Sequence, residues 1–168
     1  MVIAVDIRGS NAYQKFISNV FPLITSQHTE DTFVFIADRP FHYPIIGNTV
    51  IENIKERSSF LSAIGLQNKL SNVLKKYNAS VLVTCKPFNT NVPVCLIVEE
   101  KTNAKYLLKS KTIISASEFN KNQIAEKYKV DSKKINEVYR PVNNNYKSVD
   151  FDEREKVKET FANGNEYF

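Results

Sequence analysis

Short apolar runs recur along the chain and predict the strands of a sheet. The first run, residues 2–7, has no strict alternation of apolar and polar positions, which is typical of a strand buried on both faces of a parallel sheet. Further strands are predicted at residues 32–37, 49–54, 80–85, 92–98, 111–116 and 135–139. The third and the last of these runs carry the weakest signals.

Helical periodicity fills the longer intervals between these runs. The apolar residues from 13 to 24 fall on one helical face, and we expect this helix to bend or end near Pro22. A second helix is predicted after Ser58 and Ser59, either of which can cap it, and it is expected to end at Asn78.

Two more helices are predicted in the second half of the chain. Ser117 suits the N-cap of a helix, with Glu118 in the first turn, where the helix dipole favours a carboxylate. The inward-facing residues of this helix are expected to be Phe119, Ile124 and Tyr128. A charged helix is predicted at residues 152–161, whereas residues 101–109 are expected to form a short loop.

Strands that alternate with helices predict an α/β fold with a largely parallel, Rossmann-like sheet and helices on both faces. Residues 1–148 are expected to form one domain. Residues 149–168 would then be a linker and helix that lead to a second domain, with residues 143–145 as the first candidate for a linker. Ligands of such sheets bind at the carboxyl ends of the strands, so the functional residues are expected there.

The composition is that of one globular domain, and the charged residues are unevenly distributed along the chain. The chain has 168 residues, 42% of them hydrophobic, and a formal net charge of +5. Residues 101–147 contain 11 basic and four acidic side chains. Such a segment can attract phosphates, an anionic membrane surface or nucleic acid, or it can be a solvated face.

Several classes of site are missing from the sequence. It contains neither the glycine-rich fingerprint of dinucleotide-binding domains nor a phosphate-binding P-loop, and no nucleophile elbow of the Gly-x-Ser-x-Gly type. His28 and His42 fall in predicted connections without a second ligand at metal-binding spacing. Cys85 and Cys95 lie in apolar runs and are interpreted as buried thiols. We therefore expect no metal and no cofactor.

The amino terminus gives no sign of an export or membrane-spanning segment. Asp6 interrupts the first apolar run, which the core of a secretory signal would not carry. No run approaches the roughly 20 apolar residues that a bilayer span needs. The protein is therefore expected to be cytoplasmic.

Polar residues follow several of the predicted strands and are the candidates for a binding site. Gly9 permits close approach of the backbone to a ligand, and Arg8 offers a guanidinium fork for phosphate or carboxylate, although a simple turn also explains this loop. The loop after residue 85 carries amide and hydroxyl groups of the kind that bind sugars. Its candidates are Lys86, Asn89 and Asn91.

Two further candidates contain carboxylates. Glu99 and Glu100 end the fifth predicted strand and can act as a base or accept hydrogen bonds from hydroxyls. Ser117 and Glu118 begin a helix whose free N–H groups favour an anion. The alternatives are a solvated strand end for the first pair and a simple helix cap for the second.

Three segments together resemble a known family. Residues 2–9, 112–124 and 134–143 resemble, in order and spacing, the N-terminal half of the family 4 (group 1) glycosyltransferases, which have the two-domain GT-B fold. The most specific is Ser-Glu-Phe-x-Lys-x-x-Ile, which begins at Ser117 and follows a predicted strand. The resemblance runs from residue 1 to about residue 150.

The resemblance implies that this chain is the acceptor-binding half of a retaining enzyme. Such an enzyme transfers a hexose from a nucleotide sugar to a glycan or lipid-linked acceptor, as in polysaccharide biosynthesis. By position, the loop of Arg8, Gly9 and Ser10 matches the loop that faces the donor diphosphate. Ser117 and Glu118 match a Ser-Glu pair that, in this family, lies at the cleft between the two domains. The partners would be the donor, held by the second domain, the acceptor and the inner face of a membrane, with no nucleic acid.

The sequence departs from the family pattern at two places. Many members carry a histidine after the strand that matches residues 93–98, and Glu99-Glu100 stands there instead, so these residues are the candidates for catalysis. The hinge matches at Tyr139, Arg140 and Pro141, where Arg-Pro replaces the usual Pro-Gly. The replaced histidine favours the alternative of a non-catalytic module that binds a carbohydrate or an anionic lipid. A response-regulator-like switch would need more acidic residues than Asp6 after the first strand.

Overall fold

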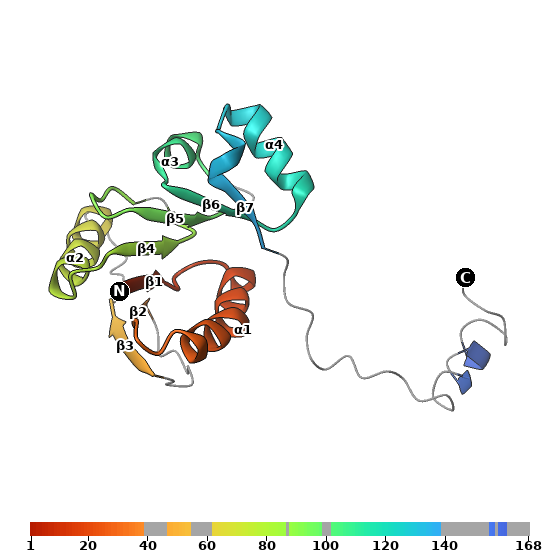
Figure 1. The fold of residues 1–168 in the computed structure, drawn as a ribbon, viewed down its shortest axis with the longest axis horizontal. Helices are drawn as coiled ribbons and strands as arrows, with labels where there is room; N and C mark the ends of the chain where they lie inside the picture. The colour runs from red at the N-terminus through yellow and green to blue at the C-terminus, as the bar shows by residue number, and fades with distance from the viewer. Residues whose placement is uncertain are drawn as a thin grey trace.

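A computed structural model describes residues 1–38, 47–54, 62–86, 88–98, 102–138, 155–156 and 158–160. These residues form one seven-stranded sheet in the order β3-β2-β1-β4-β5-β6-β7, and every neighbouring pair is parallel (Figure 1). The strands are β1 (Val2–Asp6), β2 (Thr32–Ala37), β3 (Asn48–Asn53), β4 (Val81–Thr84), β5 (Val94–Ile97), β6 (Thr112–Ser115) and β7 (Ile135–Glu137). The predicted α/β, Rossmann-like fold with a parallel sheet is confirmed.

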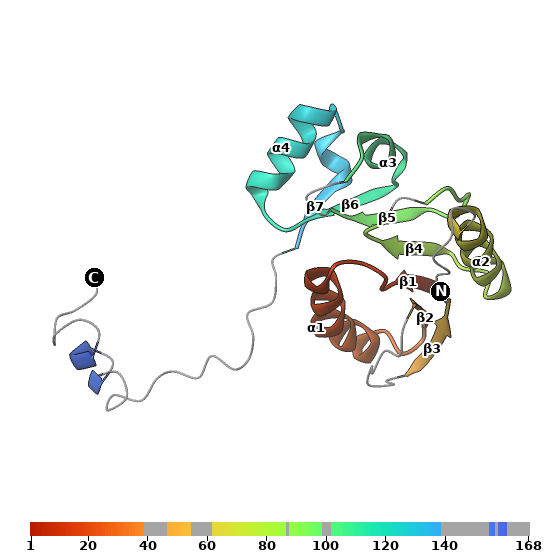
Figure 2. The ribbon, with the colours of Figure 1, turned by 180° about the vertical axis from the view of Figure 1, so that it is seen from behind.

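Helices cover both faces of the sheet. The helices are α1 (Asn11–Gln27), α2 (Ser62–Lys76), α3 (Ala104–Lys109) and α4 (Glu118–Tyr128), and the short 3-10 turn Ser132–Lys134 precedes β7. Figure 2 shows α1 and α2 on opposite sides of the sheet, and α3 and α4 together beside β5, β6 and β7. The carboxyl ends of β5 and β6 lie between α1 and α4.

The core explains why the strands read as continuous apolar runs. Phe33 and Phe35 of β2 pack on α1, where Phe21 meets both rings edge-on at centroid distances of 6.4 and 5.8 Å. Val34 and Ile36 alternate with them and pack on the side of α2. Successive residues of one strand are thus buried on opposite faces.

Pro22 does not end the first helix. The helix α1 continues through it to Gln27. Proline removes one backbone hydrogen bond from a helix, but Phe21 and Thr25, on either side of Pro22, are both buried. Tertiary packing of these side chains keeps the segment helical.

Two other expectations about the helices were wrong. Phe119 does not face inward, because its side chain is 68% exposed, whereas Ile124 is buried and Tyr128 is half-buried. The segment 101–109 contains the helix α3, whose cap is Asn103, instead of being only a loop. This helix buries Leu107 against Leu96 of β5.

Some sequence-based expectations fall outside the described residues. They concern the cap at Ser58 and Ser59, the histidine His42 and the linker at residues 143–145. The boundary between a domain at residues 1–148 and a linker at residues 149–168 stays a prediction. Within the described ranges, no helix has both the length and the apolar character that crossing a bilayer requires.

Candidate functional site

A groove with a volume of about 770 Å³ lies at the carboxyl ends of β5 and β6, between α1 and α4. Its lining includes apolar and aromatic side chains from α1 and the strands and polar side chains from α1 and α4. Those used below are Ser10, Tyr13, Phe16, Ile97, Ile114, Asn120 and Gln123. A concave site of this size, mostly apolar with a few polar groups, is typical of small-molecule binding, and parallel α/β sheets bind ligands at this edge.

A buried ion pair stands beside this groove at the end of β1. The carboxylate of Asp6 accepts two hydrogen bonds from the guanidinium of Arg8, from Nε to Oδ1 at 2.7 Å and from Nη2 to Oδ2 at 2.8 Å. The backbone N–H of Arg8 also donates to Oδ1 at 3.1 Å. The side chains of Asp6 and Arg8 are only 1% and 2% exposed. This bidentate geometry gives each buried charge its counterion.

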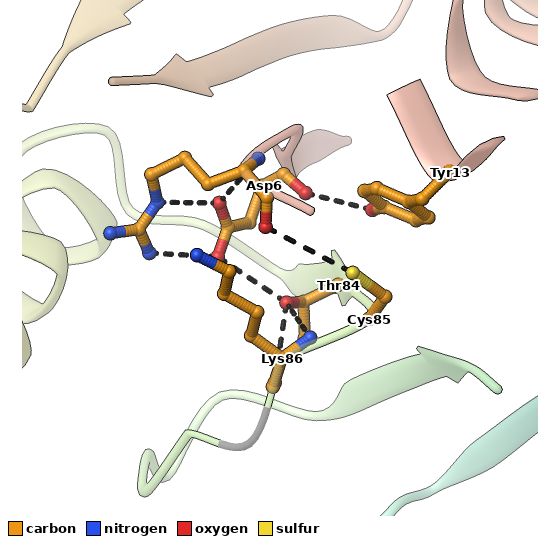
Figure 3. Close-up of polar contacts among 6 residues, drawn as sticks. Asp6, Tyr13, Thr84, Cys85 and Lys86 are labelled. Atoms are coloured by element: carbon orange, nitrogen blue, oxygen red, sulfur yellow. Dashed lines mark hydrogen bonds and ion pairs between the residues drawn. The ribbon is translucent and has the colours of Figure 1, made fainter. Parts of the chain in front are cut away.

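Further hydrogen bonds tie the ion pair to β4 and α1 (Figure 3). The hydroxyl of Thr84, at the end of β4, donates to Oδ2 of Asp6 at 3.3 Å and accepts from the backbone N–H of Lys86 at 3.0 Å. The phenol of Tyr13, in α1, donates to the backbone carbonyl of Asp6 at 2.7 Å. The Asp6–Arg8 pair therefore joins two strand ends and the first turn of a helix.

The loop predicted to face the donor phosphates is placed as follows. Arg8 is buried and two of its nitrogens bind Asp6, Gly9 is half-buried, and Ser10 is exposed and lines the groove. The hydroxyl of Ser10 caps α1 by accepting from the backbone N–H of Tyr13 at 3.2 Å. Contact of these residues with a phosphate stays a prediction.

Gly9 is required by close packing. A Cβ atom at this position would lie 2.5 Å from Cδ1 of Tyr13 and 2.6 Å from Sγ of Cys85. Both contacts are far shorter than van der Waals separations, and Tyr13 is held by its hydrogen bond to Asp6. The backbone after β1 can therefore approach α1 and β4 only because residue 9 has no side chain.

Replacing Gly9 by alanine is expected to lower the free energy of unfolding by about 1–3 kcal/mol, the usual cost of overpacking a core. Urea unfolding followed by circular dichroism measures the change. Gly65→Ala is the matched control, because a Cβ at Gly65, in α2, meets no atom within 4 Å. It should stabilise the protein by about 0.5–1 kcal/mol, since alanine favours helix. Equal stability of Gly9→Ala and the parent would contradict the packing argument.

The residues predicted to bind the acceptor are not brought together. Lys86, Asn89 and Asn91 line a second, smaller cavity of about 200 Å³, which shares no lining residue with the groove. Ser117 caps α4, its hydroxyl accepting from the backbone N–H of Asn120 at 3.2 Å, and Glu118 is exposed. A role for any of them in acceptor binding stays a prediction.

The remaining predicted site residues lie outside the described residues. These are Glu99, Glu100, Tyr139, Arg140 and Pro141. Val98 and Thr102, the described residues on either side of the glutamate pair, both line the groove.

Sequence reasoning missed the part of the site that is most firmly built, the pairing of Asp6 with Arg8. A signal was present, because Asp6 and Arg8 are opposite charges two residues apart at the end of an apolar run, where each needs a counterion if it is buried. Thr84 could not be found in this way, since its partnership with Asp6 depends on the pairing of β1 with β4.

The two cysteines are free thiols, with Cys85 buried and Cys95 half-buried. Burial raises the pKa of Cys95 to about 11. The thiol therefore stays protonated and weakly reactive at neutral pH.

The fold has been seen before in solved structures. No protein-family model matches the chain, and no curated protein matches it in sequence. The structure resembles a glycosyltransferase from Rickettsia africae ESF-5, with a TM-score of 0.57, 18% identity and coverage of 96% of this chain and 49% of that one. The chain shares its fold with glycosyltransferases.

Two more solved structures give the same result. The lipopolysaccharide outer core galactosyltransferase WaaB matches with a TM-score of 0.54 and 19% identity, over 89% of this chain and 48% of its own. HepE from Anabaena, in complex with UDP, matches with a TM-score of 0.53 and 12% identity, over 99% of this chain and 51% of its own. The chain thus spans about half the length of the solved structures that share its fold.

Proposed function

We propose that this chain is the acceptor-binding, N-terminal half of a retaining glycosyltransferase of family 4. The complete enzyme would transfer a hexose from a nucleotide sugar to a glycan or lipid-linked acceptor. The observation that supports this most is the match of 96% of the chain to about half of a glycosyltransferase. The resemblance of the segment that begins at Ser117 supports it independently.

The groove fits the acceptor side of such a reaction. Tyr13 and Phe16 supply aromatic surface, and Asn120 and Gln123 supply amides, which can donate to and accept from sugar hydroxyls. Ser10 lies at the N-terminus of α1, where free backbone N–H groups and the helix dipole favour a negatively charged group. The diphosphate of a donor is such a group.

The second domain would hold the nucleotide sugar, and catalysis would occur between the two halves. One of the structures that share the fold was solved with UDP and glucose, which is consistent with a nucleotide-sugar donor. We place the protein in the cytoplasm, with a peripheral contact at the inner face of the membrane. That contact would suit a lipid-linked acceptor.

Transfer assays on a short and a long form of the protein test the proposal. The 168-residue chain alone is expected to transfer no sugar from UDP-glucose or UDP-galactose above a boiled control. A form that continues past Phe168 into a donor-binding domain is expected to release UDP in the presence of an acceptor. Turnover by the short form would show that the donor site lies within this chain and would overturn the division into two halves.

A second candidate is a non-catalytic module that binds carbohydrate or anionic lipid. Residues 102–138, all described, contain eight lysines and four acidic residues, which favours an anionic partner. Co-sedimentation of the chain with anionic but not neutral vesicles, lost at high salt, together with no transfer by the long form, would favour this candidate.

A further inference from the structure

The smaller cavity, of about 200 Å³, has a strongly one-sided charge. It lies between the loop that follows β4 and the carboxyl-terminal end of α3. Lys86, Lys109 and Lys111 line it, and among its described lining residues there is no aspartate or glutamate. Lys109 and Lys111 are exposed, and two ammonium groups with no carboxylate in the described lining favour an anion.

Two local structures hold the lysines at this cavity. Lys109 is the last residue of α3 and Lys111 directly precedes β6. Between them Ser110 is buried, and both its backbone N–H and its hydroxyl donate to the backbone carbonyl of Tyr106, at 3.0 and 2.7 Å. The backbone N–H of Lys111 donates to the carbonyl of Val94 at 2.9 Å. The two exposed ammonium groups therefore extend from a fixed backbone.

The opposite wall is formed by an anchored polar loop. Gln67 of α2 donates through Nε2 to the backbone carbonyl of Asn89 at 2.5 Å, and the backbone N–H of Val92 donates to the hydroxyl of Thr90 at 3.0 Å. Asn89 and Asn91 line the cavity from this loop, and both are exposed. Their amides can donate to and accept from hydroxyl groups.

Aromatic side chains complete the lining. Phe88 and Tyr106 are half-buried and contribute to its walls. Ammonium groups, amides and aromatic surface together match a sugar ring that carries a negative charge better than they match a bare anion. The volume is below the roughly 300–1,000 Å³ typical of pockets for drug-sized ligands, so it suits one sugar unit instead of a nucleotide sugar.

We propose that this cavity is a second carbohydrate-binding site, specific for a sugar that carries a carboxylate or a phosphate. It is separate from the groove, with which it shares no lining residue. The site extends the proposed function but does not rest on it, because binding is measured on this chain without any transfer reaction.

Titration of the ¹⁵N-labelled 168-residue chain, followed by NMR, tests the site. The probes are glucuronate and glucose 6-phosphate, with neutral glucose as the matched control. Saturable shifts of the backbone amides of residues 88–92 and 109–111 are expected with at least one charged sugar and not with glucose. The two charged probes distinguish a carboxylate site from a phosphate site. Inorganic phosphate is titrated in parallel, and it should bind more weakly than the preferred sugar.

Variants assign the binding to the lysines. Lys109→Gln combined with Lys111→Gln is expected to raise the Kd by about fivefold to tenfold or more, the scale of losing two partly exposed charge contacts. Lys133→Gln combined with Lys134→Gln is the control, because it removes the same charge from exposed residues outside the cavity. Equal losses in both double variants would overturn the site, as would equal binding of glucose, binding of inorganic phosphate as tight as that of the preferred sugar, or no shifts with either charged sugar.

Discussion

Asp6→Ala is expected to lower the free energy of unfolding by about 3–5 kcal/mol, the usual cost of removing one partner from a buried ion pair. The change takes from Arg8 the carboxylate that binds two of its guanidinium nitrogens, while the Arg8 side chain is only 2% exposed. It also removes one of the two acceptors of the Thr84 hydroxyl, which then has the backbone carbonyl of Lys86 at 3.3 Å. Urea unfolding followed by circular dichroism measures the loss.

Two controls separate the ion pair from other effects at Asp6. Asp31→Ala removes a half-buried carboxylate that pairs with the exposed amino group of Met1, and it should cost less than Asp6→Ala, about 1 kcal/mol. The double variant Asp6→Leu with Arg8→Met removes both charges and should be more stable than Asp6→Leu alone. A double variant less stable than either single one would show that the two charges are not coupled in this way.

Glu99→Gln in the complete enzyme is expected to lower kcat by about 100-fold or more, the scale of removing a general base. The prediction rests on the proposed function. Glu99 is the first residue after the predicted strand 92–98 and stands where many family 4 members carry a histidine. We propose that its carboxylate accepts a hydrogen bond or a proton from the acceptor hydroxyl. Glutamine can accept the hydrogen bond but cannot take the proton. Steady-state kinetics with a saturating donor measures the effect.

The neighbouring carboxylate is the matched control for this variant. Glu100→Gln removes the same charge one position along the chain. It should change kcat far less, because only one of two adjacent side chains can occupy the histidine's place. If both variants have the kinetics of the parent, the pair is a solvated strand end and the acceptor is activated elsewhere.

The sheet could be predicted from the sequence because its strands are apolar on both faces. All seven strands lie within two residues of the predicted runs. In β2, for example, Phe33 and Val34 are neighbours that pack on opposite helices, and both positions must be apolar. A parallel sheet therefore leaves a strong signal in each strand separately.

The shorter helices and the site left weaker signals. The helix α3 has six residues, of which Leu107 is the one fully buried, so no periodicity could develop. In α4 Ile124 is the one fully buried residue. The apolar Phe119 is exposed, so apolar character alone does not identify the buried face of this helix. Arg8 was predicted to offer its guanidinium to a ligand, and its burial against Asp6 depends on the close packing of α1 and β4 around it.

The order of the strands sets how the domain can assemble from one end of the chain to the other. From β1 the sheet grows in two directions, through β2 to β3 and through β4, β5, β6 and β7 in chain order. During synthesis, strands from β4 onward can each join an edge that is already exposed, and the edge moves outward until β7 closes the series. Losing residues 135–137 would remove only the outermost strand, whereas losing residues 2–6 would remove the strand to which both parts of the sheet are bonded.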